Sequence, residues 1–393
     1  MAAYLDHAAT TPLRPEAAAA MLPWLTERFG NPSGSHAVAR AARTAIDDAR
    51  DVAARALGVE PGGVIFTGGG TEADNLAITG ILARRPGAVV VSAIEHHAVL
   101  HAAEAAAHAG LATECRVVPV HPDGTVDLER LAGALDPTVT VVSIMLANNE
   151  VGTIQPFGRI ARAVRRHAPN AVLHTDAVQA FPWLDVAQLA APADLISVSA
   201  HKFGGPQGTG VLAVRGDVTV APLIHGGGQE RDRRSGTHNV AGIVGMAAAM
   251  EATVASRDAT VARARALRDR LADELLGRVP GATETGERAT KVAGNCHVCF
   301  DGVESEALLV LLDDAGVCAS AGSACTSGAI EPSHVLVAMG IPRHRALGSL
   351  RLSLGHTTTD GDVDLALKVV PDAVARLRDP GSTATATPPS LGD

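Results

Sequence analysis

A lysine set among glycines is the residue whose type and position most directly suggest chemistry. Lys202 is followed closely by Gly204 and Gly205, and it is one of only three lysines among the 33 Lys and Arg residues. A poorly solvated lysine amine can lose its proton near neutral pH and condense with a carbonyl group, which a guanidinium group does not do. We therefore expect Lys202 to perform chemistry that requires an amine.

Two more features suit a cofactor that such an amine would bind. Asp176 precedes Lys202 by 26 residues (202 − 176) and ends a neighbouring predicted strand. Residues 68–70 are glycines that precede Thr71 and a helical run, where free backbone N–H groups attract an anion. Pyridoxal phosphate needs an amine, an acid beside its ring nitrogen and a phosphate site, so the spacing favours this cofactor. Two alternatives stay open: a structural salt bridge between Asp176 and Lys202, and a helix cap formed by Thr71 with Asp74.

Polar residues follow five predicted strands at the point where each strand ends. Ligands of an open parallel sheet bind beyond the carboxyl ends of its strands, so we expect these polar groups to line one site. The groups are residues 67–75, 95–97 and 148–150, then Asp176 with Gln179, and residues 199–202.

The elements that would position these groups alternate between strands and helices. From about residue 60 to residue 215, short β-branched runs alternate with stretches of helical period, which is typical of a parallel sheet built from βαβ units. A long helix over 251–276 leads to a smaller α+β lobe. The predicted strands of the first lobe are 64–66, 88–92, 139–145, 171–174, 195–198 and 211–214, and the apolar runs of the second are 292–300, 307–312 and 350–354.

The five cysteines are an odd number spread through a long chain, which argues against a disulfide framework and for a reducing compartment. Cys296 and Cys299 lie three residues apart in a strand-like run, so they point to opposite faces, and we interpret them as packing residues. Cys318 is interpreted as a core residue. Cys325 lies among small residues that anchor a loop weakly, and both an exposed nucleophilic thiol and a buried free cysteine stay open for it.

Charge and hydropathy exclude several classes of protein. The 393 residues carry a net charge of −9, so no basic surface is expected to bind nucleic acid directly. The apolar runs are shorter than the ~20 residues that a membrane helix needs, and the start shows no secretory leader. We predict a cytoplasmic protein without a membrane segment. No metal site is expected, because His97 and His101 have no third ligand nearby and are interpreted as a solvated pair.

Eight motifs resemble those of the pyridoxal-phosphate cysteine desulfurases of the NifS/IscS type, in the class V aminotransferase group. They stand in the family's order between Tyr4 and about Thr359. The motifs are TGGGTEADN, EHHAVL, NNEVG, HTDAVQ, SAHKFGGPQG, GGGQERDRRSGTHN, GSACTSG with EPSHVL, and SLRLSLG. The resemblance implies the α/β fold type I of pyridoxal-phosphate-dependent transferases. Its large lobe, with a mostly parallel seven-stranded sheet, would span 14–255, its smaller α+β lobe 1–13 and 256–378, and a flexible tail 379–393.

The resemblance also implies a role for each residue at these motifs. Lys202 would form the Schiff base with pyridoxal phosphate, and His96 would stack on the ring and assist proton transfer. Asn149 and Arg351 would bind the substrate L-cysteine, and Cys325 would accept its sulfur. The remaining cofactor contacts would be Gly70, Thr71, Asn149, Asp176, Gln179, Ser199 and His201, with Thr237 supplied by a partner subunit.

These roles imply a homodimer with shared active sites that converts L-cysteine to L-alanine. The sulfur would pass as a persulfide on Cys325 to an acceptor protein, for iron–sulfur cluster assembly, tRNA or cofactor thiolation, or DNA phosphorothioation. The alternatives are a selenocysteine lyase or another class V reaction such as transamination. The chain departs from the family pattern at His356, in the run TGGGTE, and in a C-terminal tail that lacks the segment contacting the usual scaffold protein.

Overall fold

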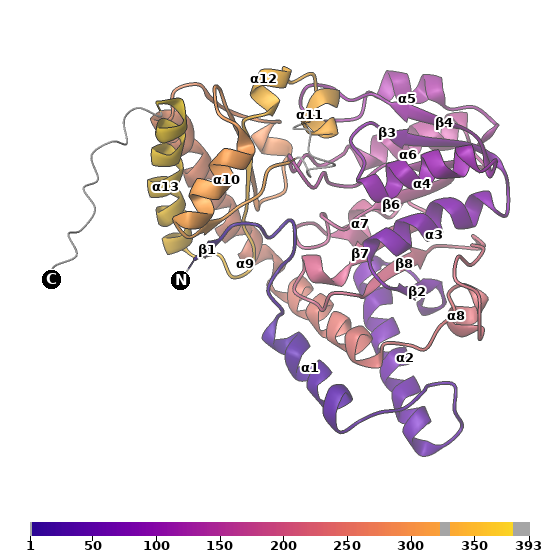
Figure 1. The fold of residues 1–393 in the computed structure, drawn as a ribbon. Coiled ribbons are helices and arrows are strands. Elements are labelled where there is room, and N and C mark those ends of the chain that lie inside the picture. The colour runs from indigo at the N-terminus through magenta and orange to yellow at the C-terminus, as the bar shows by residue number, and fades with distance from the viewer. Residues whose placement is uncertain (1, 323–330, 380–393) are drawn as a thin grey trace.

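A central sheet of seven strands forms the largest layer of the computed structural model, which describes residues 2–322 and 331–379 (Figure 1). Its strands are β2 (Val64–Thr67), β3 (Gly87–Ser92), β4 (Ala112–Val118), β5 (Val139–Ser143), β6 (Val172–Asp176), β7 (Leu195–Ser199) and β8 (Gly210–Val214). They lie in the order β2-β8-β7-β6-β5-β3-β4. All neighbours are parallel except β8, which is antiparallel to β2 and β7. The mostly parallel seven-stranded sheet implied by the resemblance is therefore confirmed.

Helices pack on both faces of this sheet. The helices of this region are α1 (Pro15–Thr26), α2 (Ala37–Leu57), α3 (Gly70–Leu82), α4 (His97–His108), α5 (Leu128–Ala134), α6 (Phe157–His167), α7 (Val186–Leu189), α8 (Gln229–Asp232) and α9 (Val240–Arg278). On one face, α3 and α4 bury apolar side chains against alternate residues of the strands, among them Val91 and Val141. On the other face, α2, α6 and α9 pack against Val90 and Val142. Because both faces are covered, the interior strands β3, β5, β6 and β7 are buried at nearly every position.

A smaller lobe packs beside the sheet, and both ends of the described chain lie in it (Figure 1). Its antiparallel sheet has the order β12 (Ser349–Ser353), β10 (Asn295–Phe300), β9 (Ala282–Glu284), and β1 (Ala3–Tyr4) pairs with β11 (Val317–Cys318). Its helices are α10 (Ser305–Asp314), α11 (His334–Ala338), α12 (Arg343–Ala346) and α13 (Asp360–Arg378). Our division of the chain after residues 13 and 255 stays a prediction, and position 255 falls inside α9. The predicted flexible tail lies outside the described residues apart from Asp379.

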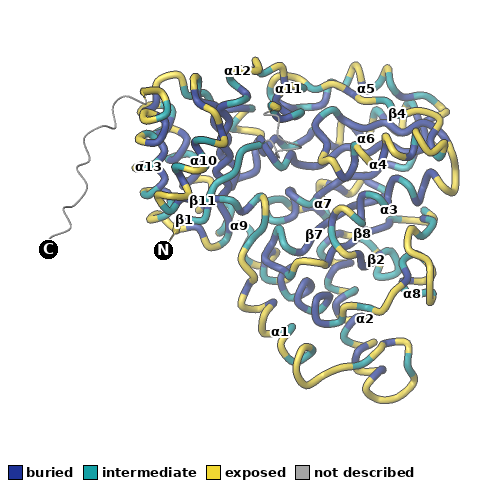
Figure 2. The backbone as a smooth tube through the Cα atoms, in the orientation of Figure 1, coloured by how far each residue is buried: buried dark blue, intermediate teal, exposed yellow. Residues whose placement is uncertain are grey.

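Burial follows these layers. Figure 2 shows the interior strands as buried and the outward sides of the covering helices as exposed. The region of α1 and α2 projects from the rest of the molecule, and the tube there is largely exposed (Figure 2). Leu22, Leu25 and Phe29 of this region are 60%, 65% and 77% exposed, which is unusual for large apolar side chains.

Two elements differ from the predictions, and one apolar run without a predicted type can now be assigned. The edge strand β4 was not predicted, because charged residues such as the exposed Glu114 and the half-buried Arg116 interrupt its apolar pattern. Helix α9 starts at Val240 rather than at residue 251, since the Asn239 side chain caps it by accepting a hydrogen bond from the Gly242 N–H. The apolar run 307–312 is part of a helix, α10.

The cysteines of the described residues are all free. Cys296 and Cys299 are buried and belong to different apolar clusters, as expected for opposite faces of β10. Cys318 is only half-buried, because it lies on the two-residue strand β11, so its assignment to the core was wrong. In the described part of the chain, no helix is long and apolar enough to cross a membrane. Within the same residues, no three His, Cys, Asp or Glu side chains are grouped so that they could hold a metal ion.

A left-handed turn within α8 is held in place by one buried carboxylate. Glu230, Arg231 and Asp232 have φ angles of 50°, 58° and 63°, a conformation that costs L-residues roughly 1–2 kcal/mol each. The Glu230 carboxylate accepts two hydrogen bonds from Arg50, at 2.8 and 2.7 Å, and one from His238 Nε2, at 2.8 Å. Burial would raise the pKa of Glu230, but these donors outweigh it and lower the pKa to about 2.

We expect Glu230→Gln to destabilise the protein by about 3–5 kcal/mol at pH 7, because Arg50 would keep its buried charge without a counter-ion. The lowered pKa of Glu230 stabilises the wild type above the unfolded value of about 4.3, and this contribution is lost as pH falls toward about 2. Urea unfolding at several pH values measures both effects. Glu251→Gln is the control: Glu251 pairs with Arg55 at 3.5 Å on the surface, and its loss should change stability by less than about 0.5 kcal/mol. Equal effects of the two substitutions would contradict the prediction.

Candidate active site

A cavity of about 350 Å³ opens at the carboxyl ends of β5, β6 and β7. Arg351 of β12 lines it from the smaller lobe, so both lobes contribute to it. This edge is where open parallel sheets bind their ligands. The cavity brings together ten of the predicted site residues: Gly70, Thr71, His96, Asn149, Asp176, Gln179, Ser199, His201, Lys202 and Arg351.

One predicted site residue lies at a different pocket, and another is not among the described residues. Thr237 is exposed and belongs to a separate pocket that Glu230 and His238 also line. Cys325 lies outside the described residues. The proposed roles of these two residues therefore rest on the resemblance to the family.

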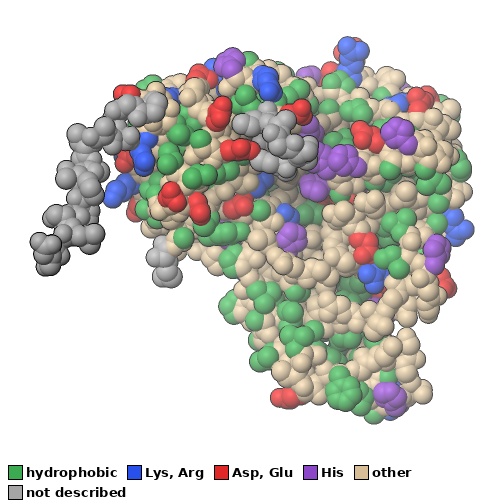
Figure 3. Space-filling view, viewed as in Figure 1, with side chains coloured by type: hydrophobic (Ala, Val, Ile, Leu, Met, Phe, Trp, Pro, Cys, Tyr) green, Lys and Arg blue, Asp and Glu red, His purple; other side chains and the backbone are tan. Residues whose placement is uncertain are grey.

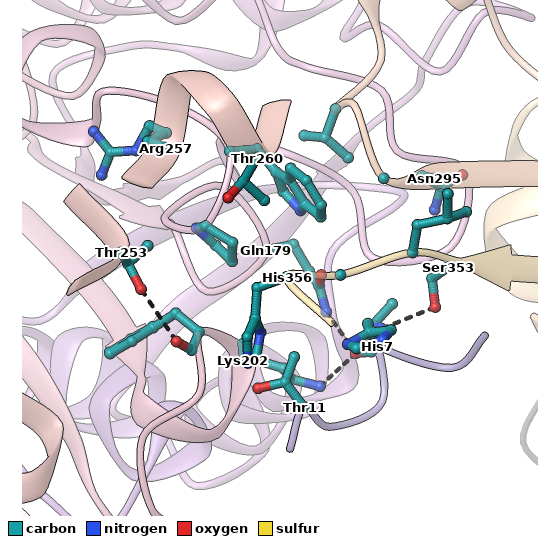
Figure 4. Close-up of a pocket in the computed structure, with 18 of the residues that line it drawn as sticks. His7, Thr11, Gln179, Lys202, Thr253, Arg257, Thr260, Asn295, Ser353 and His356 are labelled. Carbon is teal, nitrogen blue, oxygen red and sulfur yellow. Dashed lines mark hydrogen bonds between the residues drawn. The ribbon is translucent and has the colours of Figure 1, made fainter. Parts of the chain in front are cut away.

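Lys202 is held with its amine toward the N-terminal segment. It ends a short 3₁₀ turn, Ala200–Lys202, that follows β7 directly. Its Nζ donates hydrogen bonds to the carbonyl oxygens of Ala8, at 2.6 Å, and Ala9, at 2.7 Å. Figure 4 shows this amine reaching toward the segment that carries His7, seen from a smaller neighbouring cavity. Burial, followed by the charge of Arg351, lowers the pKa of Lys202 to about 8, so a substantial fraction of the amine is uncharged near neutral pH.

Asp176 and Gln179 lie at the end of β6 and just beyond it. Asp176 is buried, and one of its oxygens accepts a hydrogen bond from the Val178 N–H at 2.8 Å. Burial raises the pKa of Asp176 above its usual value, and the nearby Lys202 charge opposes that rise. Gln179 Nε2 donates to the Ala8 carbonyl at 2.7 Å, the same oxygen that Lys202 contacts. A buried carboxylate of this kind would bind a protonated ring nitrogen strongly.

The start of α3 forms the anion-binding end of the cavity. The helix cap is Gly69, with φ of 148°, and the helix begins at Gly70, so the alternative in which Thr71 caps it is wrong. A Cβ at Gly70 would come within 2.9 Å of Val178 and 3.3 Å of Ser199, so glycine permits the close approach of helix and strands. The uncovered N–H groups at this end and the Ser199 hydroxyl fit a phosphate.

Two histidines near Lys202 are held in their neutral form. His96 caps α4, its Nδ1 accepting a hydrogen bond from the Ala98 N–H at 3.1 Å, and its ring faces the cavity. Limited hydration, followed by the charge of Lys202, lowers the pKa of His96 to about 4. The same two causes lower the pKa of His201 to about 4, and its Nδ1 lies 3.1 Å from the Thr10 hydroxyl.

Arg351 is positioned by acceptors on both sides. Its Nη1 donates to the Asn149 carbonyl at 3.1 Å, and its Nη2 donates to Asp6 Oδ1 at 2.9 Å. Its Nε is buried and has no partner among the described residues. Such a fixed guanidinium lining the cavity suits a planar carboxylate.

Sequence reasoning missed several groups of the site. Asp6, which orients Arg351, and the carbonyls of Ala8 and Ala9, which hold Lys202, all lie in the polar N-terminal stretch YLDHAAT. Asp74 lies in the polar run 67–75 that was expected at the site, but it was given no role of its own except as part of a possible helix cap; it is buried and lines the cavity. The polar residues grouped near the start of the chain could have indicated a part in the site. Their sequence does not show which residues they contact.

Comparisons with known proteins agree with this geometry. A family profile described as "Aminotransferase class-V" matches residues 3–366. The chain is 46% identical to the "IscS-like cysteine desulfurase" of Mycobacterium tuberculosis, over 96% of this chain and 97% of that protein. It is 45% identical to "Cysteine desulfurase IscS" of Methanosarcina thermophila, over 96% and 93%. A solved structure described as "NIFS-LIKE PROTEIN" has a TM-score of 0.89 at 35% identity and covers 95% of this chain and 100% of that one.

The chain therefore belongs to the aminotransferase class-V family, and it shares the fold of a NifS-like protein. Within that family it is an enzyme of the cysteine desulfurase group of the NifS/IscS type, since relatives of that group match it over nearly its whole length. Enzymes of this family generally depend on pyridoxal phosphate.

Proposed function

We propose that this enzyme converts L-cysteine to L-alanine with pyridoxal phosphate and transfers the sulfur to Cys325 as a persulfide. The observation that carries the proposal is the convergence of Lys202, Asp176 and Arg351 on one cavity of about 350 Å³. An amine, a buried acid and a guanidinium in one cavity match a cofactor with an aldehyde and a ring nitrogen, together with an amino-acid substrate.

The residues of the cavity fit the cofactor. Thr71, Ser199 and the N–H groups from Gly70 onward would hold its phosphate, with His201 beside them. Asp176 would face the ring nitrogen, Gln179 the ring hydroxyl, and His96 the ring face. Bound there, pyridoxal phosphate supplies an electron-withdrawing ring that accepts charge from the substrate Cα.

The chain's own residues would orient the substrate and move its protons. Arg351 would bind the carboxylate of cysteine through two parallel hydrogen bonds, with Asn149 beside it. Lys202 Nζ, whose pKa is lowered to about 8, would take the Cα proton, because a partly neutral amine is an effective base near pH 7 to 8. The neutral ring of His96 could hold a second proton at its free ring nitrogen.

Cys325 would accept the sulfur. Its thiolate would attack the substrate sulfur, an S–S bond would form, and the C–S bond would break, with alanine as the second product after proton return to the substrate carbon. Support comes from the described residues just before it: Ser320 pairs with Arg351 through N–H···O bonds of 3.2 and 2.7 Å. Cys325 is five positions after Ser320, so a fully extended chain would place it at most about 18 Å from the Cα atom of Ser320.

We also propose a homodimer in which each subunit completes the other's site. Thr237 is exposed outside its own cavity, which supports a role at the cavity of a second subunit. The exposed apolar side chains of Leu22, Leu25 and Phe29 offer a surface of the kind that oligomers bury.

A protein, rather than nucleic acid, is the proposed sulfur acceptor. The net charge of −9 disfavours direct contact with nucleic acid. On the face in Figure 3, the described Lys and Arg side chains are scattered among acidic ones and form no continuous basic area. We propose a cytoplasmic location, which the free thiols of the four described cysteines support.

The products formed from L-cysteine test this proposal. We expect the cofactor-loaded enzyme to release one alanine for each sulfur that it transfers, because desulfuration leaves the amino group on the carbon skeleton. Amino-acid analysis of the products, with sulfide measured after addition of a thiol reductant, gives the ratio. A keto acid in place of alanine would indicate transamination, and turnover of selenocysteine alone would indicate a selenocysteine lyase; either result would contradict the proposal.

A further inference from the structure

Asp74 places a second carboxyl group at the cavity. It lies in the second turn of α3, is 1% exposed, and lines the cavity together with Asp176. Its Oδ1 has no hydrogen-bond partner among the described residues. A buried carboxylate oxygen without a partner is costly, so the protonation state of this group requires an explanation.

The sheet face that α3 covers changes from apolar to polar near the cavity. His174 and Asp176 lie two residues apart on β6 and therefore point to the same face. Ser143 pairs with His174 in the neighbouring strand, and Ser197 pairs with Asp176 on the other side. These four side chains continue the layer that Val141 and Leu195 form deeper in the core, and Asp74 lies on the same side.

His174 does not supply a counter-charge to Asp74. Its Nδ1 lies 2.8 Å from the Ser143 hydroxyl and its Nε2 lies 2.9 Å from the Ser197 hydroxyl, so both ring nitrogens are already engaged. Nε2 is 3.7 Å from Asp74 Oδ1, beyond hydrogen-bond distance. Burial lowers the pKa of His174 to about 3, and the ring is therefore neutral at working pH.

The two cavity carboxyls are unequal. Asp176 accepts the Val178 N–H and is near the Lys202 amine, and both favour its charged form. Among the described residues, the ring of His174 at 3.7 Å is the one basic group recorded against Asp74, and that ring is neutral. Burial, followed by the charge of Asp176, raises the pKa of Asp74 well above its usual value. The hydrogen bond with the Ser197 hydroxyl lowers the pKa of Asp74, and the charge of the buried Glu95 raises it further. Two neighbouring carboxyls in a buried site do not both ionise.

We propose that Asp74 is a positioning residue of the cofactor site, the protonated partner of Asp176 in a buried carboxyl pair that carries a single negative charge. The proposal rests on the proposed function, in which Asp176 faces the ring nitrogen of pyridoxal phosphate. One negative charge balances the one positive charge of a protonated ring nitrogen, so this end of the site is neutral when the cofactor is bound. Asp74 acts through Asp176: because Asp74 stays protonated, the pair carries one negative charge, which is on Asp176.

Infrared spectroscopy of the cofactor-free protein tests the protonation state directly. A protonated carboxyl group has a carbonyl stretch that ionised carboxylates lack. Glu95 and Glu150 are also buried, and burial raises their pKa values to about 8 and about 7, so each should contribute a band of its own, and Glu150→Gln is therefore present in every protein measured. In Glu95→Gln protein at pH 7 we expect one buried-carboxyl band to remain, and we expect it to vanish when Asp74→Asn is added. Adding Asp176→Asn instead is the matched control and should leave a band from Asp74.

Two results would overturn the proposal. Absence of the band in Glu95→Gln protein would show that Asp74 is ionised, and this measurement does not require an Asp74 variant to fold. Loss of the band in Glu95→Gln/Asp176→Asn protein, with Asp74 intact, would assign the proton to Asp176 instead.

The pH dependence of stability gives a second readout. Because the folded pKa of Asp74 is raised, its contribution is complete below the unfolded value of about 3.9 and is lost as pH rises toward the folded value. Asp74→Asn cannot ionise, so the ratio of the wild-type to the variant unfolding constant should rise with pH, by up to about tenfold per pH unit. The groups that face Asp74, namely His174, Asp176, Glu95 and Ser197, are common to both proteins, as is Lys202, which acts on Asp176. A ratio that stays constant between pH 5 and 8 would contradict the proposal.

Cofactor uptake separates this inference from the proposed function. Glu95→Gln/Glu150→Gln protein that shows the Asp74 band but takes up no pyridoxal phosphate would contradict the proposed function, and with it the role of Asp74. Uptake of the cofactor by protein that lacks the band would contradict only the role of Asp74. We expect both the band and uptake, with the pH midpoint of the cofactor absorbance shifted in Asp74→Asn.

Discussion

Cys325→Ala enzyme will bind its cofactor and lose sulfur transfer, with turnover of L-cysteine reduced by about 10³-fold or more. The substrate sulfur needs a nucleophile that takes it as the C–S bond breaks. None of the described cysteines, Cys115, Cys296, Cys299 and Cys318, lines the cavity, so none can replace the lost thiol. Cofactor absorbance and sulfide release, measured on the same preparation, check the two parts of the expectation.

Cys115→Ala is the matched control for this experiment. Cys115 is half-buried on the edge strand β4, outside the cavity lining, and its loss should leave turnover within about twofold of the wild type. Full desulfurase turnover by the Cys325→Ala enzyme would defeat the assignment of Cys325 as sulfur acceptor. That result would not contradict the proposed cofactor site, which is formed by other residues.

Lys202→Ala enzyme will lose the covalent link to the cofactor and its base, with turnover falling by about 10²–10⁴-fold or more. The physical reason is the lowered pKa of Lys202, about 8, which makes this amine available both as a nucleophile and as a proton acceptor. Lys202→Arg should not restore activity, because a guanidinium group stays protonated. Turnover and the visible absorbance of the cofactor are the measurements.

Borohydride reduction followed by peptide mapping identifies the lysine directly. The chain has only two other lysines, Lys291 and Lys368. Lys291 is buried and paired with Glu284 at 3.0 Å, and Lys368 lies exposed on α13. Lys368→Ala serves as the control and should keep full labelling and turnover. Label on either of these lysines, with Lys202 unmodified, would refute the assignment.

Much of the fold could be predicted because strongly apolar strands and long helices carry local signals. Six strands of the central sheet were located from β-branched runs, since burial on both faces leaves little room for polar residues. The edge strand β4 carries no such signal, because its side chains alternate between core and solvent in an irregular pattern. The start of α9 was misplaced because its Ala- and Gly-rich first turns have no helical charge pattern.

The site could be predicted in part for a related reason. Residues at strand ends converge in any open parallel sheet, so the positions of Asp176, Ser199 and Lys202 followed from the order of strands and helices. Asp74 was expected at the site only as part of the polar run 67–75, and no separate role was assigned to it because Thr and Asp three residues apart at a helix start resemble a capping box. Only the packing of α3 on the sheet shows that its carboxyl is buried.

Sequence alone determined the chemical groups of this enzyme, the sheet edge at which they gather and the family to which the motifs belong. Only the tertiary structure decided which groups touch: Asp6 with Arg351, which are 345 residues apart, and Lys202 with the Ala8 carbonyl, 194 residues away. The reason is physical, because the charge and pKa of a side chain depend on burial and on neighbours that folding brings from distant parts of the chain. The spacing of residues along the sequence does not show which residues become those neighbours.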